Sequence, residues 1–421
     1  MLLGAIADDL TGATDLALTL SREGMKTVQV VGVPPAGFDF GGADAVVVAL
    51  KSRTIPAQQA VEQSLQALAR LQEAGARQIV FKYCSTFDST AEGNIGPVTE
   101  ALLAALKDDI TIVCPAFPTN GRTVYRGYLF VGDLLLSESP MKDHPLTPMT
   151  DASLVRLMQA QTQLPVGLIP RETVAAGSAA IFAAIETAKG AGKKVLVVDA
   201  ISDDDLRSIG QAVSGLRLIT GGSGIAIGLP ENFRRRGELG PKGETTAFQA
   251  PAGRAIMLAG SCSKATRGQI EHAIGAGVPA FRVDPLAIDA GELAPDTVVD
   301  WAVAERRKVP LIYSSADPDT VRVAQEKLGR NRAGEIVEHF LAAVAAALQV
   351  RGFSRFLVAG GETSGAVVEA LGVSALFIGP EIDPGVPWTV SLGDQTPVAL
   401  ALKSGNFGSV DFFSKAWDLL Q

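Results

Sequence analysis

Two adjacent carboxylates follow the first apolar run of the chain. Asp8 and Asp9 come directly after residues 2–7, and a helical pattern begins after them. A nucleotide-binding turn would place glycines at this point, so that phosphates could approach the backbone. Paired carboxylates repel phosphate, but they accept hydrogen bonds from sugar hydroxyls, and one of them can act as a general base. Capping of the helix would explain only one of the two, so we predict a functional role for the pair.

The densest group of hydrogen-bonding side chains lies in residues 82–97, KYCSTFDSTAEGNIGP. Such a loop can satisfy several hydroxyls of a polyol at once, and the structural alternative is a Ser/Thr-rich turn that caps a helix. Cys84 has no histidine nearby in sequence, which favours a small buried thiol over a nucleophile. The segment 51–54, KSRT, follows another apolar run, and Arg53 could hold a carboxylate through two parallel hydrogen bonds. Surface charges in a solvated loop would give the same pattern.

Three glycine-rich turns follow apolar runs in the C-terminal half. They read GSCS at 260–263, GGETSG at 360–365 and KSGNFG at 403–408. Glycine lets the backbone approach an anion and Ser or Thr adds donors, so turns of this kind suit phosphates at helix N-termini. None of them is a P-loop or a G-x-G-x-x-G fingerprint. Each alone is equally consistent with a tight connection between strand and helix.

The elements that must position these residues alternate along the chain. Short β-branched runs are predicted to be strands and are separated by Ala/Leu/Glu-rich helical segments such as 56–73, 178–189 and 334–348. Strands that are apolar on both faces and alternate with helices indicate parallel sheets covered on both sides. Ligands of such sheets bind beyond the carboxyl ends of the strands. The predicted strands are 2–7, 45–50, 78–83, 110–114, 194–199, 254–260, 309–313, 355–359 and 397–403.

The length of 421 residues favours two domains. Residues 232–253 are polar, charged and rich in Gly and Pro, without a hydrophobic period, which is typical of a linker. We therefore predict one domain over 1–231, a linker over 232–253 and a second domain over 254–421. The predicted fold class is α/β, with two doubly wound domains of mostly parallel sheet and an active-site cleft between them.

Composition excludes several classes of protein. Lys plus Arg number 37 against 45 Asp plus Glu, a net charge of −8, which argues against nucleic acid or an anionic membrane as a partner. Three Cys and three His are too few and too scattered for a disulfide framework or a zinc site. The N-terminus lacks the basic start and long apolar stretch of a signal peptide. We expect a cytoplasmic protein with reduced thiols.

Together the motifs resemble those of the four-carbon acid sugar kinase family. The resemblance rests on IADDLTGATD at 6–15, on KYCSTFDST and GNIGPV within 82–98, and on the three glycine turns, in the same order over nearly the whole chain. KYCSTFDST resembles the 3-oxo-tetronate 4-kinase branch, whereas threonate and erythronate kinases read closer to KKxDSTLRGN. Ala91-Glu92 replaces the Leu-Arg pair of that pattern, which shifts contact with the substrate carboxylate to Arg53 or elsewhere.

The resemblance implies an ATP-dependent kinase that binds a small sugar acid, with a sugar-acid-binding domain over 1–231 and a nucleotide-binding domain over 254–421. Mg²⁺ is expected to neutralise the phosphates, and no residue is predicted to be a metal ligand. The sugar-acid contacts that it implies are Asp8, Asp9, Arg53, Ser85, Asp88, Ser89, Thr90 and Asn94. The ATP contacts that it implies are Ser261, Gly360, Gly361, Glu362, Thr363, Ser364, Gly405, Asn406 and Gly408.

The expected reaction is in-line transfer of the γ-phosphoryl group to the C4 hydroxyl of 3-oxo-tetronate, giving the 4-phosphate. Asp9 is the preferred base and Asp88 the second.

The alternatives are a D-threonate or D-erythronate 4-kinase of the same family and a nucleotide-linked sugar-acid oxidoreductase. A non-catalytic metabolite sensor is less favoured, because two ligand-binding domains exceed what sensing one small molecule requires. The stereochemistry of the acid, the metabolic pathway and self-association into a homo-oligomer stay open at this level.

Overall fold

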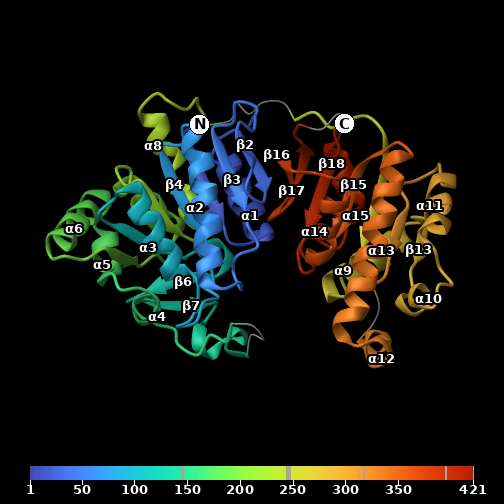
Figure 1. Cartoon of the computed structure of the whole chain (residues 1–421), viewed down its shortest axis with the longest axis horizontal. Helices are drawn as coiled ribbons and strands as arrows, with labels where there is room; N and C mark the ends of the chain where they lie inside the picture. Colours follow the sequence, from blue (N-terminus) through green and yellow to red (C-terminus); the bar gives the residue numbers. More distant parts are fainter. Residues whose placement is uncertain (144–146, 243–247, 316–317, 394–395, 421) are drawn as a thin grey trace. The chain divides into compact units, whose positions relative to one another are not determined.

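The computed structural model describes residues 1–143, 147–242, 248–315, 318–393 and 396–420 (Figure 1). The chain forms two compact units, Met1–Thr246 and Ala247–Gln421. Each unit has a sheet flanked by helices, and the prediction of an α/β fold with two domains of mostly parallel sheet is confirmed.

The sheet of the first unit has the order β2-β3-β1-β4-β11-β5-β10-β9, and neighbouring strands pair in parallel throughout. The central strands are buried along their whole length because their sequences, such as LGAIA and AVVVA, are apolar on both faces. The strands are β1 (Leu3–Ala7), β2 (Thr27–Val31), β3 (Ala45–Ala49), β4 (Gln78–Lys82), β5 (Thr111–Cys114), β9 (Val166–Ile169), β10 (Val195–Val198) and β11 (Leu218–Gly221).

Helices connect these strands, and α1 lies beside β2 and β3 in Figure 1. Helix α1 packs on β2 and β3, and α2 packs on β1. The helices of this unit are α1 (Leu10–Arg22), α2 (Ala57–Glu73), α3 (Ile95–Leu106), α4 (Leu154–Gln161), α5 (Arg171–Ala175), α6 (Ser178–Gly190), α7 (Asp203–Ala212) and α8 (Pro230–Arg235).

A small antiparallel sheet of β6 (Arg122–Tyr125), β7 (Tyr128–Val131) and β8 (Leu134–Leu135) also belongs to the first unit. Asp199, which follows β10 and is fully buried, joins it to the main sheet. The Asp199 carboxylate accepts the backbone N–H groups of Arg126, Gly127 and Arg171 at 2.6, 2.8 and 2.9 Å. The buried carboxylate thereby satisfies donors from two separate loops.

The sheet of the second unit has the order β13-β14-β12-β15-β18-β17-β16. Its pairings are parallel up to β18, and β16, β17 and β18 pair antiparallel. The strands are β12 (Arg254–Ala259), β13 (Ala280–Arg282), β14 (Leu311–Tyr313), β15 (Phe353–Ala359), β16 (Ala375–Asp383), β17 (Val386–Ser391) and β18 (Ala399–Lys403). The helices are α9 (Lys264–Gly275), α10 (Pro285–Asp289), α11 (Pro295–Ala304), α12 (Pro318–Leu328), α13 (Arg330–Val350), α14 (Gly361–Ala370) and α15 (Phe412–Lys415).

Helix α13 is the longest apolar helix. Its segment Arg332–Val350 is long and apolar enough to cross a membrane by length and composition, with a mean hydropathy of 1.3. The helix packs against α11 and α14, and it fully buries Leu341, Val344 and Leu348. These contacts are those of a core helix, and the helix covers the segment 334–348 that the sequence predicts to be helical.

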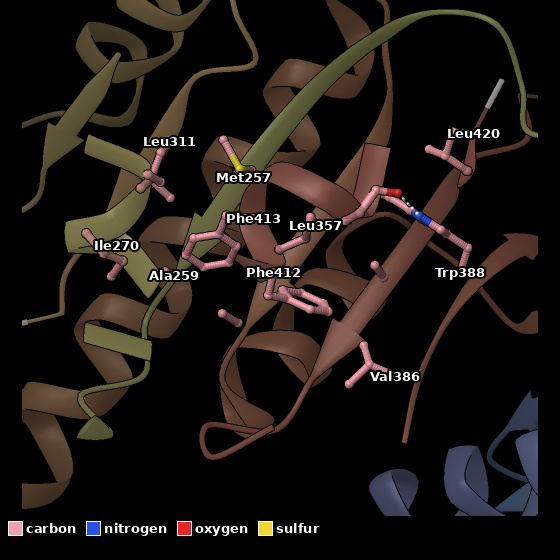
Figure 2. Packing of buried hydrophobic residues seen from close by; sticks show 14 of the residues in the cluster. Met257, Ala259, Ile270, Leu311, Leu357, Val386, Trp388, Phe412, Phe413 and Leu420 are labelled. Carbon is pink, nitrogen blue, oxygen red and sulfur yellow. Dashed lines mark hydrogen bonds between the residues drawn. The ribbon is translucent and has the colours of Figure 1, made fainter. Parts of the chain in front are cut away.

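Aromatic side chains join the C-terminal segment to the core of the second unit (Figure 2). Trp388 on β17 is fully buried, and its Nε1–H donates to the Ala416 carbonyl at 2.7 Å. Its ring lies 5.3 Å from that of Trp417. Phe412 and Phe413 are buried in the same cluster beside Leu357. The chain after β18 is therefore part of the fold of this unit.

The segment 232–253 is only partly the extended linker expected from its composition. Helix α8 runs to Arg235, and Asn232 and Phe233 are buried. The Asn232 amide donates to the Gly210 carbonyl at 2.8 Å, which ties the start of this segment to α7. Residues 243–247 lie outside the described part of the chain.

We predict that Trp388→Phe lowers the free energy of unfolding by about 1–3 kcal/mol, because the buried Ala416 carbonyl loses its donor. Urea unfolding followed by circular dichroism measures this change. Trp417→Phe is the matched control, because Trp417 is only partly buried and its Nε1–H donates to Phe413 within the same turn. An equal or larger loss in the control would contradict the prediction.

Candidate functional site

The carboxyl ends of β3, β1 and β4 meet in the first unit. Ala7 pairs with Ala49 on one side and with Lys82 on the other. The Asp8 N–H donates to the Lys82 carbonyl at 3.0 Å, and the Asp8 carbonyl accepts from Arg53 N–H at 3.2 Å. The parallel register therefore brings together the three loops that carry the predicted sugar-acid residues.

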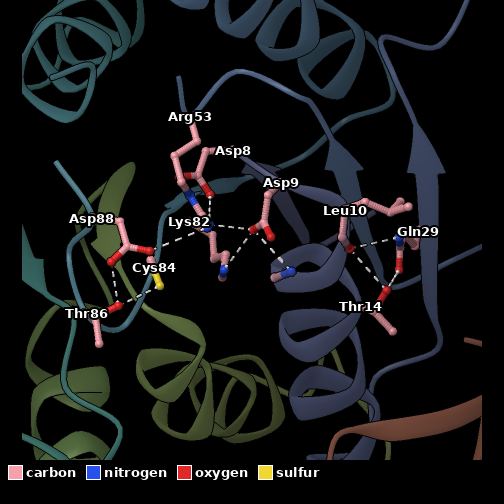
Figure 3. Close-up of polar contacts among 11 residues, drawn as sticks. Asp8, Asp9, Leu10, Thr14, Gln29, Arg53, Lys82, Cys84, Thr86 and Asp88 are labelled. Carbon is pink, nitrogen blue, oxygen red and sulfur yellow. Dashed lines mark hydrogen bonds and ion pairs between the residues drawn. The ribbon is translucent and has the colours of Figure 1, made fainter. Parts of the chain in front are cut away.

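Arg53 lies among three carboxylates of the protein (Figure 3). Its Nε and Nη2 donate to the two Asp8 oxygens, both at 2.8 Å. Nη2 also donates to Asp9 Oδ1 at 2.6 Å, and Nη1 lies 3.7 Å from Asp88 Oδ2. Lys82 Nζ lies 3.6 Å from Asp9 Oδ1. Arg53 is therefore engaged by protein carboxylates at a position where the resemblance implies contact with the substrate carboxylate.

Asp8 and Asp9 differ in acidity although they are adjacent. Burial raises the pKa of Asp8 above its ordinary value, even though Arg53 acts in the opposite direction. Burial also acts to raise the pKa of Asp9. There, however, Lys82, Arg53 and the Gly12 N–H outweigh burial, and the pKa of Asp9 is lower than usual. Asp9 also caps α1, since its Oδ1 accepts the Gly12 N–H at 3.1 Å.

The loop after β4 directs Asp88 toward this cluster. Phe87 and Asp88 have φ angles of 65° and 43°, which non-glycine residues rarely adopt. The buried Phe87 ring packs edge-on against Tyr83, with centroids 5.6 Å apart, and anchors the turn. Thr86 Oγ1 donates to Asp88 Oδ1 at 2.6 Å, and Cys84 Sγ lies 3.0 Å from Thr86 Oγ1. Burial raises the pKa of Cys84 to about 11, which favours the thiol over a nucleophilic thiolate.

The remaining predicted sugar-acid residues fall into two groups. Asn94 donates through Nδ2 to the carbonyls of Ser52, Arg53 and Ile55 at 2.7, 3.2 and 2.9 Å, so its amide fixes the Arg53 loop. Ser89 Oγ accepts from Gln161 Nε2 at 3.0 Å. Ser85 and Thr90 are partly exposed, and their hydroxyls have no side-chain hydrogen bond within the described residues.

Two residues that the sequence analysis did not single out also belong to this site. Lys82 is a charged residue at the end of the buried strand QIVFK, which is a signal that sequence alone could have given. Gln161 comes from α4, far along the chain, and only the fold brings it to Ser89 and to the Gly96 N–H.

Three glycine turns follow the adjacent parallel strands β12, β15 and β18 in the second unit. The Gly260 N–H donates to the Ala359 carbonyl at 3.0 Å, and the Gly360 N–H to the Lys403 carbonyl at 2.9 Å. A Cβ at Gly260 would lie 2.2 Å from Thr363 Oγ1, and one at Gly405 would lie 2.6 Å from Ser261 Oγ. Glycine is required at these positions because the turns pack against one another.

This set of turns presents donors for an anion. Gly360 precedes α14 with a φ of 131°, and the first N–H groups of a helix have no partner within it. Ser364 Oγ in the first turn of α14 is buried without a hydrogen-bond partner among the described residues. Gly361 and Glu362 are exposed at the helix start, whereas Thr363 is buried.

The loop around Gly408 is held from α9. The Gln269 amide donates to the carbonyls of Phe407, Gly408 and Ser409 at 3.0, 2.9 and 3.0 Å. Ser409 also donates through its N–H to Asp383 Oδ2 at 2.8 Å. Within the described part of the chain, no group of three or more His, Cys, Asp or Glu side chains is placed to hold a metal ion.

Comparisons with known proteins agree with this division. The family model described as a sugar-binding N-terminal domain matches residues 3–229, and that of a nucleotide-binding C-terminal domain matches residues 256–413. Proteins of Cupriavidus necator and Salmonella typhimurium, both named 3-oxo-tetronate kinase, are 58% and 45% identical to this chain. The matches cover 99% and 98% of this chain and 96% and 98% of the relatives. The chain belongs to the four-carbon acid sugar kinase family.

Two solved structures have the same fold. One, from Salmonella typhimurium LT2, has a TM-score of 0.91 and 44% identity, and the match covers 98% of each chain. The other, protein HI1011 of Haemophilus influenzae, has a TM-score of 0.89 and 43% identity, covering 99% of this chain and 100% of that one. In this four-carbon acid sugar kinase, the acidic cluster lies within the match to the sugar-binding domain and the glycine turns lie within the match to the nucleotide-binding domain.

We predict that Gly12→Ala lowers the free energy of unfolding by about 1–3 kcal/mol, as overpacking against neighbouring side chains does. The new Cβ would lie 1.8 Å from Lys82 Nζ and 2.3 Å from Asp9 Oδ1, so the acidic cluster would have to shift. Urea unfolding measures the change. Gly190→Ala in α6 is the control, since no atom lies within 4 Å of its new Cβ. Equal stability of the two variants would contradict the prediction.

Proposed function

We propose that the chain is an ATP-dependent kinase that phosphorylates the C4 hydroxyl of 3-oxo-tetronate. The observation that carries this proposal is the full-length similarity, at 45–58% identity, to relatives named 3-oxo-tetronate kinase. Two chemically distinct sites support it, since one unit offers carboxylates and hydroxyls and the other offers a glycine-lined anion cradle. We also propose a cytoplasmic location, because ATP and 3-oxo-tetronate are both small metabolites.

The second unit is proposed to bind ATP through the predicted residues of its three turns. The cradle fits phosphate, because glycines admit the backbone closely and the Ser364 hydroxyl has no other partner in the described chain. Mg²⁺ supplies charge neutralisation when it is bound with the nucleotide. We propose that ATP oxygens and water supply most of its ligands, because Mg²⁺ keeps several waters and binds substrate phosphates.

In the first unit we propose two roles for the predicted residues. Arg53 and Asn94 are positioning residues, because their donors are occupied by the carboxylates and by the backbone of the protein. The partly exposed hydroxyls of Ser85 and Thr90 are available to the oxygens of the sugar acid. Arg53 then keeps Asp8 and Asp9 together, instead of gripping the substrate carboxylate.

Asp88 is the better candidate for the base. Asp9 Oδ1 is engaged by Gly12, Arg53 and Lys82, and these groups lower the pKa of Asp9 and make it a weak proton acceptor. Asp88 Oδ2 has a single contact with a cation, at 3.7 Å. In the proposed step, Asp88 takes the proton of the C4 hydroxyl while that oxygen bonds to the γ-phosphorus and the bond to ADP breaks.

We expect ADP release with 3-oxo-tetronate and Mg²⁺ to exceed that with D-threonate or D-erythronate by at least about ten-fold in kcat/KM. A site shaped for one oxidation state discriminates through the hydrogen bonds that it makes to that group. A coupled ADP-release assay across the three acids measures this. Equal or better turnover of a reduced acid would assign the chain to the alternative substrates. Absence of ATP turnover, together with nicotinamide binding, would favour the oxidoreductase.

Asp88→Asn is expected to lower kcat by about 10²–10⁴ with little change in the KM for ATP, because it removes the proton acceptor. Asp9→Asn should reduce kcat less and raise the KM for the sugar acid, since Asp9 organises the cluster. Asp133→Asn, in the exposed turn after β7, is the control and should leave both constants unchanged. A kcat for Asp88→Asn near that of the wild type would exclude Asp88 as the base.

A further inference from the structure

Lys403 is a buried lysine at the end of β18, and only 1% of its surface is exposed. Its Nζ donates to Thr266 Oγ1 at 2.9 Å and to the carbonyls of Ser404 and Gly405 at 3.2 and 3.0 Å. These contacts use all three donors of the ammonium group. Within the described chain, no carboxylate forms an ion pair with Lys403. Burying an ammonium group without a counter-charge costs free energy, so the presence of a lysine at this position needs a specific explanation.

The Gly405 carbonyl is where the contacts of this lysine converge with those of α9. This oxygen lies 2.5 Å from Ser263 Oγ, 2.9 Å from Thr266 Oγ1 and 3.0 Å from Lys403 Nζ. Ser263 is the N-cap of α9, and Thr266 lies in its first turn. Donors from two separate elements therefore fix the direction of a single carbonyl group.

The orientation of the Gly405 carbonyl also sets the direction of the Asn406 N–H, which belongs to the same peptide group. The described chain has no cis peptide bond, and in a planar trans peptide the C=O and N–H point in opposite directions. The Asn406 N–H therefore points away from Lys403. Asn406 is exposed, and its N–H has no acceptor among the described residues. Gly405 itself lies against Ser261. The Asn406 N–H therefore belongs to the same group of three glycine turns that presents donors for an anion.

We propose that Lys403 is a positioning residue for the nucleotide, which holds the Gly405–Asn406 peptide so that the Asn406 N–H donates to a phosphate oxygen. This inference rests on the proposed ATP binding and extends it to a residue outside the predicted contact set. Lys403 does not touch the phosphate in this arrangement. It acts through the peptide, and its charge adds a favourable potential beneath the turn.

The protonation state of Lys403 gives a signature that a purely structural residue would lack. Burial lowers the pKa of Lys403 to about 8, so the ammonium loses a proton and a donor as pH rises through this value. Phosphate groups, with a second pKa of about 6, are already ionised there. None of the charged residues on the elements packed against Lys403 pairs with it. These residues are Lys264, Arg267, Glu271 and His272 on α9, Arg355 on β15 and Glu362 and Glu369 on α14.

Calorimetric titration of the full chain with ATP, adenosine and 3-oxo-tetronate tests the proposal at pH 7 and about pH 9.5. Lys403→Met should weaken ATP binding about ten-fold at pH 7, as expected for loss of one hydrogen bond to a charged group. Adenosine and 3-oxo-tetronate binding should change less than about two-fold. Wild-type affinity for ATP should fall toward that of Lys403→Met at the higher pH. Lys403→Arg stays charged, so its ATP affinity should not depend on pH in this range.

Lys308→Met is the matched control, because Lys308 also donates to a backbone carbonyl, at 2.6 Å from Ala276 O, but precedes β14, which β12 and β15 separate from β18 in the sheet. It should bind all three ligands as the wild type does. Equal losses of ATP and adenosine binding in Lys403→Met, or unchanged pH dependence in Lys403→Arg, would overturn the proposal. If Lys403→Met does not fold, the pH dependence of ATP binding by Lys403→Arg still tests the proposal. A wild-type chain that binds no ATP would overturn the proposed function as well.

Discussion

Parallel pairing of adjacent strands is the constraint on which both sites depend. Because β3, β1 and β4 run in the same direction, their final residues lie side by side, and the loops that carry Asp8, Arg53 and Asp88 must meet. The same holds for β12, β15 and β18, whose carboxyl ends bring the three glycine turns together. A one-residue change in register would move each functional loop and reverse the faces of its strand.

The acidic site has more negative than positive charge within the cluster that Figure 3 shows. Asp8, Asp9 and Asp88 face Arg53 and Lys82, so the charges do not cancel. Such a site disfavours phosphate groups and favours hydroxyl donors. The glycine turns of the second unit instead present helix N–H groups and the unpartnered Ser364 hydroxyl, beside the single carboxylate of Glu362 in the first turn of α14.

Sequence patterns were sufficient for the strands that lead into the sites, because runs such as AVVVA are apolar on both faces. They also located the loops that meet at the carboxyl ends of these strands, since Gly, Ser, Thr and Asp are concentrated after those runs. They did not reveal the antiparallel pairing of β16, β17 and β18, which follows from tertiary packing. Nor could they show that Arg53 is occupied by Asp8 and Asp9. A contact between residues more than forty positions apart has no local signature.

The partly buried Arg53 and the buried Lys403 are stabilised in different ways. Arg53 is neutralised by carboxylates, as an always-charged and planar group allows through paired hydrogen bonds. Lys403 is solvated by carbonyl and hydroxyl dipoles and keeps its net charge. A carboxylate beside Lys403 would cancel the positive potential beneath the glycine turns and repel phosphate. Carbonyl and hydroxyl groups around Lys403 avoid that repulsion. They stabilise the buried ammonium less than a carboxylate would, so burial lowers the pKa of Lys403.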